Sequence, residues 1–291
     1  MSMAFKGNKA KTRCLRASYA SPFLTAMGHL LFGLSEPVHA FDAVRPDLNA
    51  RKTQIIDSVA APWPSVGRVN VAGISKTSMC TGTLIAPNLV LTAAHCLFDR
   101  VTGRLFPVGD VKFIAGVRRN LFSEQMQASC FRIPGNYTPS RKPHLKDVRE
   151  DVALIVLSKD SLLPSVGQVP AKDLLTPPRH ANLQAAGYHK DRNYLPTLDP
   201  SCQIVDEVDG IWLTNCASKQ GASGGPIFME DKGKLRIAGV LSATAGKSTS
   251  VVVPRPRWQK LLDHPFCTSS TRRAEPVDLT GQFNWTSDVP Q

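Results

Sequence analysis

The chain has 291 residues with a mean hydropathy of −0.12, and hydrophobic residues make up 42% of it. These values are typical of a soluble globular protein of one or two domains. The formal net charge is +12, but the basic residues are spread as singles and short pairs, without a basic helix or interleaved aromatic residues. Nucleic-acid binding is therefore not expected.

The first 40 residues have the pattern of an export signal. A start with five lysine and arginine residues precedes an apolar stretch over 17–34, and Val38-His39-Ala40 has small residues at the two positions that a signal peptidase reads. Pro22 and His29 interrupt the apolar stretch, which makes it short for an uncleaved membrane anchor, the alternative interpretation. We therefore expect cleavage near Ala40, a secreted or periplasmic protein, and no stable membrane insertion.

Residues 41–54 are polar and lack periodicity, which predicts a leader or N-terminal arm. From Ser65 onward, short apolar segments alternate with turn residues, a pattern that favours short strands over long helices. A first group of strands is expected between residues 55 and 165, in the segments 66–73, 81–96, 111–117 and 152–157.

A proline-rich break over 160–178 separates this group from a second one, which we expect within residues 166–267. Two groups of about six strands are typical of two barrels or of one large sandwich. One short helix is expected over 257–266, and the polar residues 268–291 are expected to form a loose tail. The strands of the second group are expected at 182–188, 202–208, 211–216, 226–230, 235–243 and 248–253.

Seven cysteines are present, and Cys14 lies inside the export signal. The remaining six are an even number, which in an exported chain indicates disulfides formed in an oxidising compartment. No CxxC pair or His/Cys cluster in the sequence indicates a metal site, and we expect no cofactor. The six are Cys80, Cys96, Cys130, Cys202, Cys216 and Cys267.

Two predicted hairpins bring four of these cysteines into pairs. A three-residue loop at Val208-Asp209-Gly210 and a turn centred on Asn88 each place two cysteines directly opposite one another. Directly opposed residues lie about 4.5–5.5 Å apart at Cα, which suits a disulfide. The predicted pairs are Cys80–Cys96, Cys202–Cys216 and, by elimination only, Cys130–Cys267, for which two free thiols are the alternative.

The segment KQGASGGPI over 219–227 places one serine among three glycines. A flexible linker is one interpretation, and a nucleophile on a tight turn is the other. In the second, Ser223 attacks a substrate, and the backbone amides of Gly221 and Ser223 form an oxyanion hole. The glycines would permit the backbone conformations that such a turn requires.

His95 and Asp151 are the candidates for the base and for the carboxylate that orients it. His95 ends an apolar strand and precedes Cys96, whose predicted disulfide would fix the backbone of the histidine. Asp151 opens an apolar run, which places it at the boundary of a core. A surface histidine and a surface aspartate are the alternatives, and Asp99 and Asp147, both in polar loops, are rival carboxylates.

The motifs LTAAHC, EDVALIVL and GASGGP occur in this order and carry His95, Asp151 and Ser223. In these motifs the chain resembles the trypsin/chymotrypsin-like serine peptidases, over about residues 65–262. The resemblance implies an all-β fold of two six-stranded antiparallel barrels, with the site in the cleft between them. It also implies a secreted serine endopeptidase that hydrolyses protein or peptide substrates through a Ser-His-Asp triad and an acyl-enzyme intermediate. We further expect a monomer.

Two departures separate the chain from trypsin-like members of the family. Ala222 stands directly before the serine, where this family usually has an aspartate that pairs with a newly cut N-terminus, and no basic residue directly precedes Ile55-Ile56. Activation through such an ion pair is therefore not expected. Cys216 lies seven residues before Ser223, as in some secreted bacterial glutamyl-endopeptidase-like members, which makes that branch the closer match.

The residues expected to line the specificity pocket are neutral. Ala217 stands where trypsin-like enzymes carry an aspartate, and Leu241 stands where glutamyl-specific relatives carry a histidine. Ser242 and Thr244 continue the wall without a charge. We therefore expect cleavage after small or medium apolar residues rather than after Lys, Arg or Glu.

Two other classes of function are alternatives. A member of the same fold that only binds a partner would not become acylated on Ser223. In an esterase of the α/β-hydrolase type, GASGG would be the GxSxG nucleophile elbow. That fold requires a helix after the elbow, whereas Pro226 begins a predicted strand. It also requires the catalytic histidine after the serine, and only His264 follows Ser223.

Overall fold

The structure is a computed structural model, and it describes residues 53–73, 77–140, 144–245 and 249–267. The expected export signal, most of the leader and the polar tail lie outside these residues. Among the described helices, none has the length and apolar character needed to cross a membrane.

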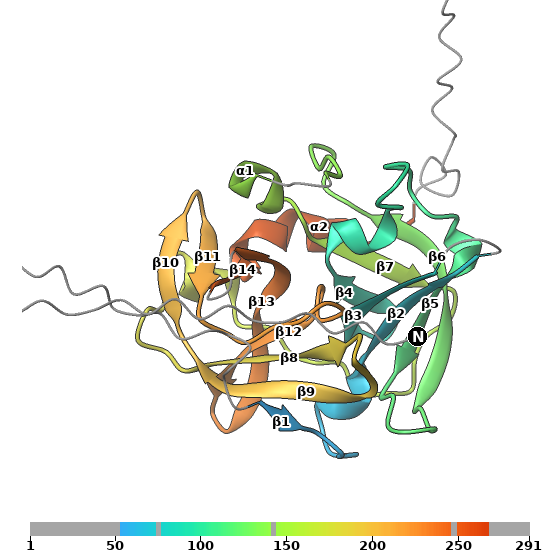
Figure 1. The fold of residues 1–291 in the computed structure, drawn as a ribbon, viewed down its shortest axis with the longest axis horizontal. Coiled ribbons are helices and arrows are strands. Elements are labelled where there is room, and N and C mark those ends of the chain that lie inside the picture. Colours follow the sequence, from blue (N-terminus) through green and yellow to red (C-terminus); the bar gives the residue numbers. More distant parts are fainter. Residues whose placement is uncertain (1–52, 74–76, 141–143, 246–248, 268–291) are drawn as a thin grey trace, which may run out of the picture. The chain divides into compact units, whose positions relative to one another are not determined.

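Six antiparallel strands close into a barrel, which confirms the first predicted group (Figure 1). The order around the barrel is β2-β3-β4-β7-β6-β5. β2 alternates buried and half-buried residues along most of its length, whereas every residue of β7 is buried, so the period-2 pattern and the continuous apolar run both occur. The strands are β2 (Val66–Ala72), β3 (Thr77–Ala86), β4 (Leu89–Thr92), β5 (Val111–Ala115), β6 (Glu124–Arg132) and β7 (Ala153–Leu157).

The second group of strands forms an eight-stranded sheet with β1 and β10 at its two ends, rather than the expected closed six-stranded barrel. Its order is β1-β9-β8-β12-β13-β14-β11-β10. The strands are β1 (Gln54–Ile55), β8 (Leu183–His189), β9 (Arg192–Cys202), β10 (Ile204–Val208), β11 (Ile211–Thr214), β12 (Pro226–Asp231), β13 (Lys234–Ala245) and β14 (Thr249–Pro254).

The sequence analysis did not predict two long strands, β6 and β9. β6 carries polar residues at most of its positions, and β9 contains Pro196 and Pro200, which argue against a strand. β9 tolerates them because its ladder with β8 shifts register at both prolines, between Cys202 and Asp199 and between Thr197 and Arg192. On its other side, β1 pairs with Thr197 and Leu198 only. Ile55 therefore belongs to the second sheet, although the sequence assigned it to the first group.

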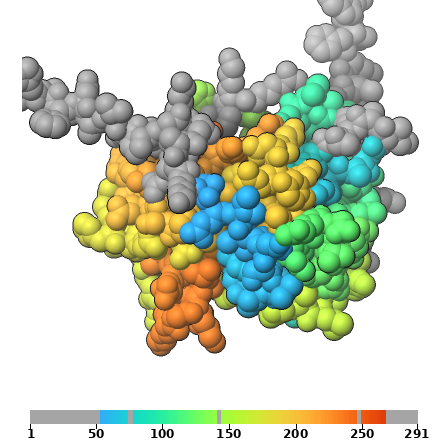
Figure 2. Space-filling model, turned by 60° about the horizontal axis from the view of Figure 1, so that its bottom comes forward, coloured from blue at the N-terminus to red at the C-terminus, as the bar shows by residue number. Residues whose placement is uncertain are grey.

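The segment after β1 crosses between the two groups of strands. In Figure 2 it lies as a blue band between the yellow and orange residues of the second sheet and the green residues of the barrel. Asp57 forms ion pairs of 2.9 and 2.6 Å with Arg118 and Arg119 of the barrel. The interior is also continuous, since one cluster of buried residues includes Phe113 of β5 and Phe228 of β12.

All three predicted disulfides are present, but two of the hairpin registers differ from the prediction. Val208 pairs with Ile211, so Asp209-Gly210 is a two-residue turn, and both of its residues have positive φ angles, 53° and 73°. A bulge between Ile204 and Asp206 then shifts the ladder by one residue and brings Cys202 and Cys216 to a Cα separation of 4.8 Å.

In the other hairpin, Ala86 pairs with Leu89, so Pro87-Asn88 is a two-residue turn rather than a turn centred on Asn88. Cys96 lies beyond the end of β4, in the 3₁₀ helix η3 (Ala94–Leu97), and reaches Cys80 from there with a Cα separation of 6.0 Å. The cysteines are therefore paired without being opposed in a ladder.

Short helices complete the fold, including the expected C-terminal one. 3₁₀ helix η6 runs directly into α2, and Trp258 at their junction is fully buried. Cys130 on β6 bonds to Cys267 after α2, which ties the end of the described chain to the barrel. The remaining helices are η2 (Trp63–Ser65), η4 (Val108–Asp110), α1 (Leu145–Val148), η5 (Ala171–Leu174), η6 (Arg255–Trp258) and α2 (Gln259–Asp263).

Candidate active site

His95 lies in η3, directly after the buried strand β4. Its neighbours Ala94 and Cys96 are buried, and the Cys80–Cys96 disulfide ties this short helix to β3. The imidazole itself keeps 20% of its surface exposed. The local chain is therefore fixed while the ring stays accessible from the cavity.

Asp151 holds His95 through two hydrogen bonds, one with its backbone amide and one with its imidazole ring. Its Oδ1 accepts from the His95 backbone amide at 2.8 Å, and its Oδ2 lies 2.7 Å from His95 Nδ1. The Ser242 hydroxyl also donates to Oδ2. Because an ionised carboxylate can only accept, Nδ1 carries the proton and Nε2 is left with a lone pair.

The environment keeps Asp151 ionised although the residue is only 5% exposed. Burial alone would raise the pKa of this carboxyl, but the neighbouring His95 and the hydrogen bonds from His95 and Ser242 outweigh burial and hold the pKa below its usual value. The negative charge is thus available to stabilise an imidazolium ring.

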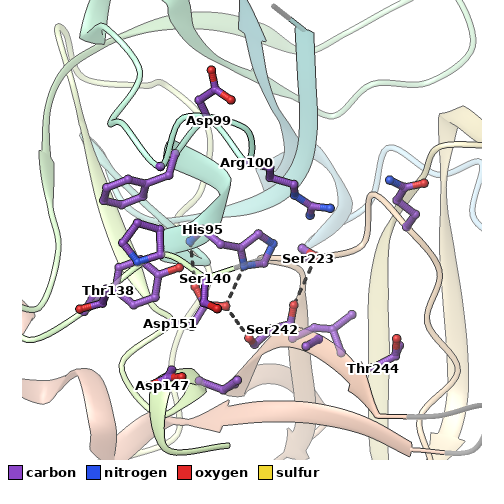
Figure 3. Close-up of a pocket in the computed structure, with 18 of the residues that line it drawn as sticks. His95, Asp99, Arg100, Thr138, Ser140, Asp147, Asp151, Ser223, Ser242 and Thr244 are labelled. Carbon is purple, nitrogen blue, oxygen red and sulfur yellow. Dashed lines mark hydrogen bonds and ion pairs between the residues drawn. The ribbon is translucent and has the colours of Figure 1, made fainter. Parts of the chain in front are cut away.

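Ser223 lies on the loop between β11 and β12. In Figure 3 the His95 ring lies between Asp151 and Ser223. The Ser223 hydroxyl donates to the Ser242 carbonyl at 3.3 Å, and among the described residues that is its hydrogen-bond acceptor, rather than His95. Ser242 therefore contacts both the nucleophile candidate and Asp151.

The loop before Ser223 presents two backbone amides with free donor capacity. Carbonyls of residues 220–223 each accept a hydrogen bond, whereas within the described chain the amides of Gly221 and Ser223 donate none. Gly221 has φ of +101° and Gly224 has φ of +80°, conformations that favour glycine. Two donors on one turn can stabilise a negative oxygen.

The rival carboxylates have other roles. Asp99 accepts hydrogen bonds from the amides of Val101 and Thr102 at 2.7 and 3.3 Å, and so closes its own loop. Asp147 accepts from the His144 amide at 3.1 Å at the start of α1. The carboxylate that contacts the His95 ring is Asp151.

A cavity of about 930 Å³ opens in front of these groups. Three of the residues that the sequence assigns to the specificity pocket line one side of this cavity, namely Leu241, Ser242 and Thr244. Ser218 also lines it and was not predicted. Ala217, which the sequence also assigned to this pocket, is buried and is not among the residues that line the cavity, and its amide donates to Asp199 Oδ2 at 2.7 Å. The residues 241–244 carry no charge, while the cavity lining elsewhere includes the charged side chains of Lys219 and Arg100.

The opposite side of the cavity includes Tyr137 and Phe98, whose ring centroids are 5.6 Å apart. Burial and the nearby Asp151 carboxylate raise the pKa of Tyr137, so its hydroxyl stays protonated. No sequence motif marks these two residues, because loops far apart in the chain bring them together.

The one close His/Cys/Asp/Glu group that the described residues offer for a metal ion is Cys80, His95 and Cys96. Both cysteines are consumed in a disulfide, so neither can supply a thiolate ligand. The group does not fit a metal site.

Comparisons with known proteins agree with this geometry. The family model described as Trypsin matches residues 57–255. Human serine protease 23 is 27% identical over 198 residues, covering 58% of this chain and 49% of that protein. Chymotrypsin-like elastase family member 1 of Macaca fascicularis is 25% identical over 230 residues, covering 71% of this chain and 84% of that protein.

A solved structure described as a Glu endopeptidase in complex with MPD has a similar fold. The TM-score is 0.59 at 17% identity, covering 76% of this chain and 99% of that one. The chain spans about half the length of serine protease 23, so the comparison with that protein concerns only the shared part. Because the family model covers most of the chain, including His95, Asp151 and Ser223, the chain belongs to the trypsin family of serine peptidases.

Proposed function

We propose that the protein is a secreted serine endopeptidase with His95, Asp151 and Ser223 as its catalytic triad. The observation that carries the proposal is the convergence of three distant segments on one cavity, with His95 Nδ1 2.7 Å from Asp151 and Ser223 on the far side of the ring. Membership of the trypsin family supports peptide hydrolysis as the reaction.

The reaction begins when the Ser223 hydroxyl turns from the Ser242 carbonyl to His95 Nε2, which accepts its proton as the oxygen attacks the scissile carbonyl. The amides of Gly221 and Ser223 donate to the oxyanion that forms. His95 then returns the proton to the leaving amine, which releases the C-terminal product and leaves an acyl group on Ser223. A water molecule, activated by the same ring, hydrolyses this ester.

Asp151 stays ionised through the cycle, since its pKa is held below the usual range. It keeps the proton of the neutral ring on Nδ1 and stabilises the imidazolium that forms during attack. Ser242 supports this role, because its hydroxyl donates to the same carboxylate oxygen.

The substrates we propose are chains with a small or medium apolar residue before the cleaved bond. Leu241, Ser242 and Thr244 give the cavity wall no charge, and the buried position of Ala217 supplies no carboxylate of its own. The structural neighbour is a Glu endopeptidase by its description, and Leu241 offers no positive charge for such a residue.

Secretion is supported by three disulfides, which form in oxidising compartments, together with the export pattern of the first 40 residues. The mature chain would begin near Phe41. Mass spectrometry of the exported protein tests this step, because a chain that keeps its first 40 residues contradicts cleavage.

The function is tested by incubating residues 41–291 with a peptide library and identifying cleaved bonds by mass spectrometry. We expect hydrolysis after apolar residues, and none with Ser223→Ala. A profile dominated by Lys, Arg or Glu before the cleaved bond would contradict the specificity. Absence of hydrolysis by the wild-type chain would favour a protein that binds without turnover, with the serine hydroxyl remaining on Ser242.

A further inference from the structure

The oxyanion loop, residues 219–225, carries the amides of Gly221 and Ser223. Gly221 and Ala222, the two residues before Ser223, have no polar side chain that could anchor this loop. Ala222, at its centre, is 2% exposed and apolar, and Gly221 on one side has the conformational freedom of glycine. A side chain that helps the backbone bonds of the loop to fix the two amides must therefore come from another part of the chain. We propose that the hydroxyl of Thr81 on β3 positions the oxyanion hole, an inference that rests on the proposed peptidase function.

Thr81 contacts the loop at both ends. Its amide donates to the Ser223 carbonyl at 2.8 Å, and its hydroxyl donates to the Gly221 carbonyl at 3.0 Å. The same hydroxyl accepts a hydrogen bond from the Tyr188 amide at 2.9 Å. The Tyr188 amide cannot accept, so this contact uses a lone pair of the oxygen and leaves its single proton for the Gly221 carbonyl.

The bond to Gly221 decides where the two amides point. The Gly221 carbonyl belongs to the peptide group between the two groups that carry the Gly221 and Ser223 amides. Those neighbouring groups are tied by Lys190 N to Gln220 O at 2.7 Å and by Gly225 N to Ala222 O at 2.8 Å. The middle group is held at both of its polar atoms, since the Ala222 amide donates to the Lys219 carbonyl at 3.0 Å and the Thr81 hydroxyl donates to the Gly221 carbonyl. Because a peptide group is planar, the Thr81 bond restricts rotation of this group and so also restricts the amides on either side of it.

The surroundings make this hydroxyl hard to replace. Thr81 is fully buried, and the Thr92 hydroxyl donates to its carbonyl at 2.8 Å, so the strand cannot shift easily. A Cβ built on Gly224 would lie 2.2 Å from the Thr81 carbonyl oxygen, which shows how closely the loop lies on β3. Without the hydroxyl, the Gly221 carbonyl and the Tyr188 amide would both lose a partner in a dry environment.

The same strand supplies a matched control. Thr83 lies two residues further along β3 and is 1% exposed, and its hydroxyl has no hydrogen-bond partner among the described residues. Thr83→Val therefore removes a buried hydroxyl of the same size without touching the loop. Thr81→Ser keeps the hydroxyl at position 81 and serves as the rescue variant.

The first experiment measures kcat and KM of the wild type and the three variants on one peptide substrate. Loss of oxyanion stabilisation acts on the transition state, so we expect kcat of Thr81→Val to fall by roughly 10²-fold, with KM changed by less than about threefold. Thr81→Ser and Thr83→Val should stay close to the wild type. The pH dependence of kcat should not move, because the contact between His95 and Asp151 is untouched. Equal activity of Thr81→Val and Thr83→Val would overturn the inference.

A second readout does not need activity. Hydrogen–deuterium exchange of peptides covering residues 217–225 should be faster in Thr81→Val than in Thr83→Val, because the loop is released only in the first. Equal exchange in the two variants overturns the positioning role even if activity has fallen. If the wild type hydrolyses no peptide but exchange still separates the variants, the proposed function fails and the structural role of Thr81 stands.

Discussion

The two halves of the site differ in how complete they are. In the closed barrel, His95 and Asp151 are already in contact at 2.7 Å, and the carboxylate is buried and ionised. In the second sheet, the Ser223 hydroxyl donates to Ser242, and the loop around it depends on glycines with positive φ. His95 is therefore already paired with its carboxylate, whereas the Ser223 hydroxyl is bonded to Ser242 rather than to His95.

Hydrogen bonds between the barrel side and the second sheet link the two halves of the site. Ser242 of β13 reaches Asp151 beside the barrel, and Thr81 of β3 reaches the loop of Ser223. Each unit thus completes the half of the site that the other carries. Substitutions can therefore be chosen that disrupt the barrel half, the sheet half or the hydrogen bonds between them.

The largest effect is expected when a reacting group is removed. Ser223→Ala or His95→Ala should each lower kcat by about 10⁶-fold, and the double variant should lose little more, because the two groups act as a unit. Steady-state kinetics on one peptide substrate measures this. His180→Ala, an exposed histidine outside the site, is the control. Additive losses in the double variant would contradict a shared proton transfer.

Asp151→Asn tests the contact between His95 and its carboxylate. An amide at this position no longer fixes the proton on Nδ1, so kcat should fall by about 10⁴-fold while KM changes little. Asp147→Asn is the matched control, because Asp147 also lines the cavity but serves α1. If both asparagine variants lost activity equally, Asp151 would not be the orienting group.

The disulfides separate stability from activity. The pairs Cys80–Cys96 and Cys202–Cys216 close loops of similar length, 16 and 14 residues, so replacing either pair by alanines should cost a similar roughly 2–5 kcal/mol of unfolding free energy. Only loss of the first pair loosens η3, and it should lower kcat more. Urea denaturation and kinetics on both variants check this, and equal loss of kcat would argue against a role for η3 rigidity.

The smallest effect concerns acid stability of the second sheet. His189 at the end of β8 is buried, and burial lowers its pKa from 6.5 to about 4, with Asp191, Lys219 and Arg192 as its charged neighbours. The unfolded chain therefore binds a proton between about pH 6.5 and 4 that the folded chain does not. The free energy of unfolding should fall by roughly 3 kcal/mol as the pH drops through this window, and no further below it on account of this residue.

His189→Gln isolates that contribution. The variant should show a flatter dependence of unfolding free energy on pH between 6.5 and 4 than the wild type, when both are measured by urea denaturation. His264→Gln provides a control histidine on the described surface. A slope that His189→Gln leaves unchanged would mean that the pKa of His189 does not differ between the folded and unfolded chains.

Local signals account for the elements that the sequence predicted correctly. The strands β2, β4 and β7 follow their hydrophobic patterns. Short motifs also mark His95, Asp151 and Ser223, whose catalytic roles stay predictions. β9 was missed because its prolines argue against a strand, and only the pairing with β1 and β8 shows how the sheet accommodates them.

Contacts between distant segments account for the rest. The hairpin over 202–216 was predicted with a three-residue loop, which is wrong. The pair Cys202–Cys216 was still correct, because a β-bulge that the sequence pattern does not indicate brings the two cysteines back into alignment. Thr81 acts on residues 140 positions away along the chain, and Ser242 on one 91 positions away. Roles of this kind depend on the tertiary fold, which residue spacing does not encode.

Labelling with a fluorophosphonate tests the central claim most directly. The account predicts that the probe adds its mass to one peptide, the one containing Ser223, in the wild-type chain, and that His95→Ala slows this strongly while Ser223→Ala abolishes it. A wild-type chain that stays unlabelled, or that carries the probe on a residue outside the 219–227 segment, would contradict a serine nucleophile activated at this cavity.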